Sequence, residues 1–184
     1  MTARMFRFLI FPSFPRAVLL SALALAACSP ALNWREVRPE GTRLSLLLPC
    51  KPDKAQKVVP LGGRPTSLSM LGCDADGATF AVAIADVDDP SQAASVLALW
   101  QDLALANMKA VPASRQPLPL KIPGASPGTP VTRLQAQGQR ADGTAVSGQA
   151  AYFVQGSQLF QVVMYAPHLM PEAAETFFSS LKLE

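Results

Sequence analysis

Five aspartates and one histidine are residues whose types allow catalysis. The aspartates lie between residues 74 and 89 and are Asp74, Asp76, Asp86, Asp88 and Asp89. The histidine is His168. Two carboxylates at a suitable separation act as general acid and base in glycoside hydrolysis. An envelope hydrolase that uses carboxylates near residues 74–89, with His168 as a further group, is therefore one hypothesis.

Other readings of the same residues are simpler. Asp74-x-Asp76-Gly77 begins like a calcium loop, but the later oxygen ligands of such a loop are missing. Zinc needs three or four nitrogen or sulfur ligands, and the chain has one histidine. His168 stands between Pro167 and Pro171, in a predicted exposed loop. We therefore expect a polar turn and a helix cap here, with no catalytic residue, metal or cofactor.

Cys28 has a different chemistry, which the residues before it define. Arg4, Arg7 and Arg16 precede an apolar run that ends in small side chains, as in export signals. The sequence Leu25-Ala26-Ala27-Cys28 resembles the lipobox of bacterial lipoproteins. The resemblance implies that residues 1–27 are a removed signal peptide. It also implies a diacylglyceryl group on the Cys28 sulfur and an acyl chain on its new amino terminus.

Two other interpretations of this leader are weaker. A transmembrane helix needs about 20 apolar residues, and Pro12, Pro15 and Arg16 interrupt this stretch. An ordinary secretory signal would leave Cys28 as a free thiol in an oxidising compartment. Two or three acyl chains anchor a protein stably, so we expect attachment to the membrane through the lipid.

Residues 28–33 form a short tether between the lipid and the domain at residues 34–184. Ser29 follows Cys28, and among the lipoproteins that this leader resembles a residue other than Asp there implies the outer membrane. The five residues from Ser29 to Asn33 span at most about 17 Å. We expect a single periplasmic domain that lies close to the bilayer.

The charge of the chain resides in its leader. The sequence has 16 basic and 13 acidic residues, and removal of Arg4, Arg7 and Arg16 leaves 13 basic residues against 13 acidic ones. The rest of the chain is formally neutral and has no cluster of Lys or Arg. Nucleic-acid binding depends on such clusters, so we expect no nucleic-acid partner.

Cys50 and Cys73 are the remaining thiols, and each one closes an apolar run. In an exported protein with a lipidated Cys28 they are the one possible intrachain pair. A catalytic dithiol usually has C-x-x-C spacing, which is absent. We predict a disulfide that joins neighbouring strands and contributes about 3 kcal/mol to stability.

Apolar alternation and turn residues predict most of the strands. Strands are expected at residues 43–48, 57–61, 66–73, 78–87, 131–138, 144–155 and 158–166, with an edge strand near 118–122. Turns are expected at residues 49–53, 74–77, 141–143 and 155–157. The most apolar strand, Leu159–Tyr165, is expected at the centre of the sheet.

Two helices complete the pattern. The first is capped by Asp89, starts at Pro90 and ends near Lys109. Its predicted packed residues are Val96, Leu97, Trp100, Leu103, Ala104 and Met108. The second runs from Glu172 to about Leu181 and buries Ala174, Phe177, Phe178 and Leu181.

This order of elements predicts the α+β class, an antiparallel sheet with two main helices packed on it. The order, with the ending Phe177-Phe178-Ser179-Ser180-Leu181, resembles PsbP-like domains over most of residues 34–184. The resemblance implies a non-enzymatic binding or assembly-accessory module. The leading hypothesis is therefore an envelope lipoprotein that binds an envelope protein or ligand. The alternatives are the hydrolase and a purely structural lipoprotein.

Overall fold

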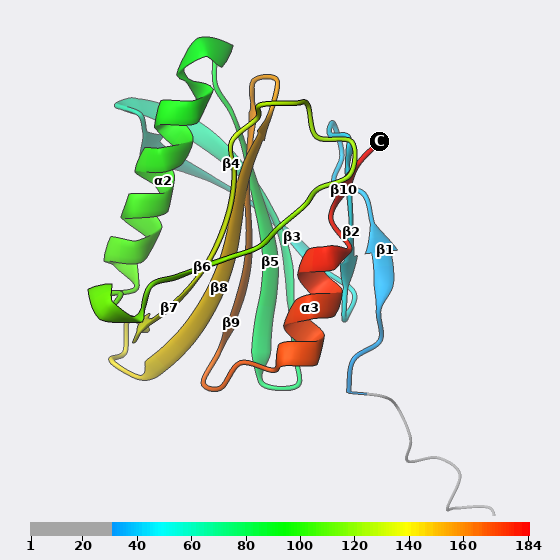
Figure 1. Cartoon of the computed structure of the whole chain (residues 1–184), viewed down its shortest axis with the longest axis vertical. Coiled ribbons are helices and arrows are strands. Elements are labelled where there is room, and N and C mark those ends of the chain that lie inside the picture. Colours follow the sequence, from blue (N-terminus) through cyan, green and yellow to red (C-terminus); the bar gives the residue numbers. More distant parts are fainter. Residues whose placement is uncertain (1–30) are drawn as a thin grey trace, which may run out of the picture. The chain divides into compact units, whose positions relative to one another are not determined.

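A seven-stranded antiparallel sheet forms the centre of the computed structural model, which describes residues 31–184 (Figure 1). In spatial order its strands are β3 (Asp53–Leu61), β4 (Arg64–Ala75), β5 (Ala78–Asp86), β9 (Gln158–Ala166), β8 (Ala145–Gln155), β7 (Val131–Gln139) and β6 (Gln116–Leu118). The α+β class with an antiparallel sheet is confirmed, and β9 lies at the centre as predicted. Cys28 and the rest of the leader lie outside the described residues.

Different layers cover the two faces of this sheet (Figure 1). One face carries helix α3 (Pro171–Ser179) and a small sheet, and we call it the α3 face. The strands of the small sheet are β1 (Arg35–Val37), β2 (Leu44–Leu48) and β10 (Lys182–Leu183). The other face carries helix α2 (Ala93–Asn107), which follows the short 3-10 helix η1 (Pro90–Gln92), and we call it the α2 face.

Strand alternation separates the two layers residue by residue. In β5, Phe80, Val82 and Ile84 belong to the core cluster of the α3 face. Their neighbours Ala83 and Ala85 belong to the cluster beneath α2. Successive side chains of a strand point to opposite faces, so β5 is buried on both sides and carries small residues toward α2.

The predicted turns follow from local chemistry. Asp76 and Gly77 both have positive φ, 51° and 74°, which a tight two-residue hairpin requires. Gly156 (φ 62°) and Gly143 (φ 87°) occupy the corresponding left-handed positions between β8 and β9 and between β7 and β8. These turns set the register of the sheet, and the predictions made for them are confirmed.

The predicted helix start at Pro90 is the 3-10 helix η1, and α2 itself begins later, at Ala93, and ends at Asn107. The Asp89 carboxylate accepts a hydrogen bond from the Ser91 amide at 2.9 Å, so the predicted cap is confirmed. Leu97 and Trp100 are buried, but Leu103 is 40% exposed, and the prediction that it packs on the sheet is wrong. The helix crosses from the β3–β4 turn, where Val96 contacts Gly62, to β7 near Gly138. It therefore covers only part of the face.

Three predicted boundaries are corrected. Strand β3 starts at Asp53 rather than residue 57, because the long strand β4 pairs with it over its whole length. The edge strand β6 spans Gln116–Leu118 instead of 118–122, since Pro119 and Pro123 have no amide to continue the ladder. Helix α3 ends at Ser179, and Leu181 is buried beyond it, before β10.

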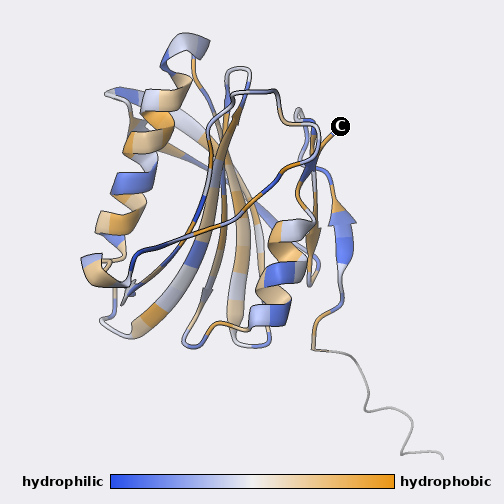
Figure 2. Ribbon diagram, in the orientation of Figure 1, coloured by the Kyte–Doolittle hydropathy of each residue, from blue (hydrophilic) through white to orange (hydrophobic). Residues whose placement is uncertain are grey.

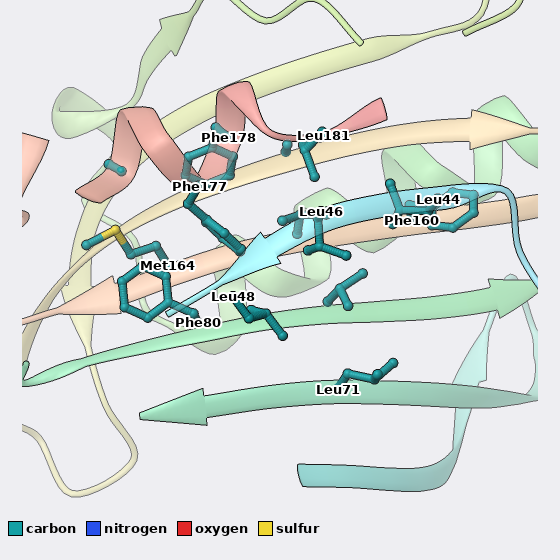
Figure 3. Close-up of a cluster of buried hydrophobic side chains, with 14 of the residues drawn as sticks. Leu44, Leu46, Leu48, Leu71, Phe80, Phe160, Met164, Phe177, Phe178 and Leu181 are labelled. Atoms are coloured by element: carbon teal, nitrogen blue, oxygen red, sulfur yellow. The ribbon is translucent and has the colours of Figure 1, made fainter. Parts of the chain in front are cut away.

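The core of the α3 face is dense and aromatic (Figure 3). The Phe177 ring lies edge-on to Phe80 at 5.3 Å and to Phe178 at 5.0 Å, and all three side chains are fully buried. Leu44, Leu46 and Leu48 of β2 pack into the same cluster. The small sheet thus supplies a second apolar layer that closes this face.

One charge is buried in the same layer. The Arg133 guanidinium of β7 lies 4.3 Å from the centre of the Phe178 ring and donates to the Gln149 amide oxygen at 2.8 Å. Its salt bridge to the exposed Glu175 is 3.4 Å long. Burial lowers the pKa of Arg133, and Glu175 opposes that effect. This contact joins α3 to the sheet.

Candidate functional site

The predicted disulfide is present. Cys50 and Cys73 are bonded, with their Cα atoms 6.0 Å apart. Cys50 follows β2 of the small sheet, and Cys73 lies on β4 of the large sheet. The bond therefore joins the two sheets covalently, rather than two strands of one sheet.

The five candidate aspartates do not form one cluster. Asp74 and Asp76 lie at the β4–β5 turn, whereas Asp86 ends β5 and Asp88 and Asp89 follow it. The nine residues of β5 span about 27 Å. His168 follows β9, whose Tyr165 pairs with Thr79 at the Asp74 end. The structure thus separates His168 from Asp86, Asp88 and Asp89.

The acids at the far end line a polar cleft of about 660 Å³. Each carboxylate there already has a protein partner. Asp88 forms a salt bridge with Arg64 at 2.9 Å, and Asp86 accepts a hydrogen bond from Ser157 at 3.3 Å. Asp89 caps η1, and the Ser91 hydroxyl and amide lower the pKa of its carboxyl.

These contacts explain the acids as turn and cap residues. Asp74 at the other end similarly accepts a hydrogen bond from Thr79 at 2.6 Å. Within residues 31–184, no group of three or more His, Cys, Asp or Glu side chains is placed to hold a metal ion. The cleft is a polar surface whose charged groups serve the fold.

One further sequence pattern is typical of a catalytic serine. Residues Gly124-Ala125-Ser126-Pro127-Gly128 spell G-x-S-x-G, the pattern of a nucleophile elbow. Such an elbow joins a strand to a helix, but Ser126 is exposed in the irregular connection between β6 and β7. Strand β7 begins at Val131 opposite Phe153, far from the His168 end of the sheet. The pattern is a coincidence of proline and glycine turns.

The α2 face has an open groove of about 690 Å³. Its walls are apolar. Trp100 and Leu103 of α2 line it together with Val59 and Pro60 of β3 and Leu68 of β4. Figure 2 shows hydrophobic residues on most turns of α2. Leu99 and Leu103, one helical turn apart, are 42% and 40% exposed. An exposed apolar surface beside a groove is typical of a binding site.

The floor of the groove carries two polar groups from β9. The Tyr165 ring packs against Gly148, where an added Cβ would come within 2.8 Å of the ring. Gln161 donates to the Tyr152 hydroxyl at 3.0 Å. Burial raises the pKa of both Tyr152 and Tyr165. Tyr165 lines the groove, whereas Tyr152 is fully buried and is linked to the groove only through Gln161.

The mouth of the groove has a single charge. Arg140, in the β7–β8 turn, is the one charged residue among those that line it. In the described part of the chain its guanidinium forms no salt bridge. The adjacent Asp142 carboxylate is already bound by the Thr144 amide and hydroxyl, which lower the pKa of that carboxyl.

The groove is what the sequence analysis missed. The stripe of Val96, Trp100 and Leu103 has the same helical spacing whether all or part of it meets the sheet.

No helix of residues 31–184 is long and apolar enough to cross a membrane. In comparisons with known proteins, no protein-family model matches this chain, and no curated protein matches it.

Proposed function

We propose that this chain is a bacterial lipoprotein. Residues 1–27 act as its signal peptide, and Cys28 carries the lipid that attaches it to the membrane, which Ser29 suggests is the outer membrane. The sequence Leu25-Ala26-Ala27-Cys28 is the observation that carries the proposal. The disulfide Cys50–Cys73 supports it, since such bonds persist in oxidising compartments outside the cytosol.

The domain behind the anchor serves as a non-enzymatic binding module that works near the membrane. The open groove on the α2 face supports this role, because its apolar surface has no partner within residues 31–184. A PsbP-like architecture is consistent with the antiparallel sheet covered by α2 and α3, and the resemblance to those domains likewise favours binding over catalysis.

The hydrolase hypothesis receives less support. Its carboxylates at residues 86–89 are engaged in a salt bridge, a cap and a turn, and His168 stands at the other end of the sheet. A purely structural lipoprotein would need Cys28 but tolerate changes in the groove.

A pull-down with matched variants separates these roles. The whole protein is extracted from bacterial envelopes in mild detergent, and the proteins and lipids that co-purify are identified. A partner should be recovered with the natural protein and with Val58→Glu, and lost with Leu103→Glu. Val58 is 66% exposed and lies on the strand face opposite Val59. It is an exposed apolar residue like Leu103, but it lies outside the groove, so it serves as the control. Recovery of nothing, or equal recovery from all three, contradicts the binding role.

A further inference from the structure

We infer that the groove on the α2 face binds a single-chain anionic amphiphile, such as a free long-chain fatty acid. The chain lies between α2 and strands β3 and β4, and the head group meets Arg140. The inference rests on the binding role proposed above and names the class of ligand. It combines three features of the groove: its apolar walls, its one unpaired cation and its place on the sheet.

The walls suit an acyl chain. The side chains of Leu103, Val59, Pro60 and Leu68 are hydrocarbon, and Trp100 adds an indole with a single nitrogen. Helix α2 has a single charged residue, Asp102, in its 15 residues. A groove of about 690 Å³ falls within the range that holds one small molecule.

The mouth suits an anionic head. Arg140 forms no salt bridge to the rest of residues 31–184, and a guanidinium binds a carboxylate through two parallel hydrogen bonds. The amides of Asn107 and Gln139 line the same end and offer further donors. Asp142 interacts with the Arg140 side chain through charge alone, while its carboxylate accepts from Thr144, so the guanidinium N–H donors of Arg140 have no partner within residues 31–184.

Two other occupants fit less well. A helix that lies on an anionic membrane surface carries Lys and Arg on its polar face, and α2 has neither. Acyl chains attached at Cys28 have less support as the occupant, because the first large apolar residues that the structure describes, Leu32 and Trp34, pack on the α3 face. The groove opens on the α2 face, and the sheet lies between it and these two residues.

The tryptophans make a direct test possible. Trp100 lines the groove, whereas Trp34 packs against Phe80 on the α3 face, with ring centres 6.0 Å apart. In the full-length protein with Trp34→Phe, held in lipid nanodiscs, all tryptophan fluorescence comes from Trp100. Titration with 9,10-dibromostearate, whose bromines quench indole, should then give saturable quenching.

Charge recognition is tested in the same titration. Arg140→Gln should weaken the apparent affinity about tenfold, which corresponds to one lost charge-assisted contact. The methyl ester of the probe, which has no charge, should bind the natural site as weakly. Arg115→Gln is the matched control, because Arg115 is exposed and does not line the groove. Its affinity should equal that of the parent.

Quenching that does not saturate, or an affinity that stays at the parent value both in Arg140→Gln and with the ester, overturns the inference. Such quenching would come from probe dissolved in the bilayer. The mass of the N-terminal peptide, measured on the same sample, tells whether Cys28 is lipidated. A lipidated protein without saturable quenching therefore contradicts the ligand and leaves the anchor intact.

Discussion

The two faces of the central sheet are covered in different ways. The α3 face is closed by a helix, a three-stranded sheet and a disulfide that joins this sheet to β4. The α2 face is covered by one helix that crosses it obliquely and leaves a groove of about 690 Å³. The first face holds the large aromatic core, and the second exposes apolar side chains. The comparison assigns stability mainly to the α3 face, and the α2 face is the one for which we propose binding.

The largest expected difference is in the free energy of unfolding, between a variant of a buried apolar residue and a variant of an exposed one. Phe177→Ala empties a fully buried site on the α3 face and should lower the free energy of unfolding by about 3–5 kcal/mol. Leu103→Ala, on the α2 face, should cost less than about 1 kcal/mol. Urea denaturation of both variants measures the difference, and similar costs would break the comparison.

The disulfide should have the next largest effect. Replacement of Cys50 and Cys73 by serine removes a cross-link with a sequence separation of 23 residues and should cost about 3 kcal/mol. Reduction of the natural protein should lower its urea midpoint to that of the double variant. The reductant should have no effect on the double variant. An unchanged midpoint in both experiments would mean that the bond does not hold the small sheet.

A smaller effect is expected at η1, the short 3-10 helix that leads into α2. Asp89→Ala removes the side chain that accepts from the Ser91 amide and should cost about 1 kcal/mol. Asp89→Asn keeps an acceptor and should cost less. Hydrogen exchange should speed up in α2 more than in α3, and equal changes in the two helices would mean that the faces are tightly coupled.

The smallest effect is one of pH. Both tyrosines of the chain belong to the α2 face, and burial raises the pKa of each above its usual range. This contribution to stability is full below about pH 10, the unfolded value, and is lost as the pH rises through the folded pKa. Tyr152→Phe with Tyr165→Phe should flatten the fall in stability above pH 10. Urea denaturation at pH 8 and pH 11 tests this, and an unchanged fall contradicts it.

The two faces also differ in how far the sequence predicts them. The turns at Asp76-Gly77 and Gly156 and the cap at Asp89 were predicted because neighbouring residues determine them. Strand β10, only two residues long, depends on pairing with Ser45 and Leu44, far away in the chain, and no local pattern marks it. The disulfide was predicted from the count of cysteines, whereas the sheets that it joins were not.

The groove was beyond prediction for a geometric reason. Leu97 and Leu103 are both leucines on one apolar helix, yet one is buried and the other is exposed. They are six residues apart and therefore about 120° apart around the helix axis, so Leu97 faces the sheet and Leu103 lies at the edge of the contact. How far the sheet reaches around the helix depends on close contacts such as Gly62 with Val96 and Gly138 with Met108, which sequence spacing does not reveal.

The anchor at Cys28 is the claim from which the account of location follows. The most direct test is the intact mass of the protein purified from the membrane fraction, with tandem sequencing of its first peptide. We predict a chain that begins at Cys28 and carries the mass of a diacylglyceryl group and one amide-linked acyl chain. A chain that begins at any other residue, or an unmodified Cys28, would contradict the account.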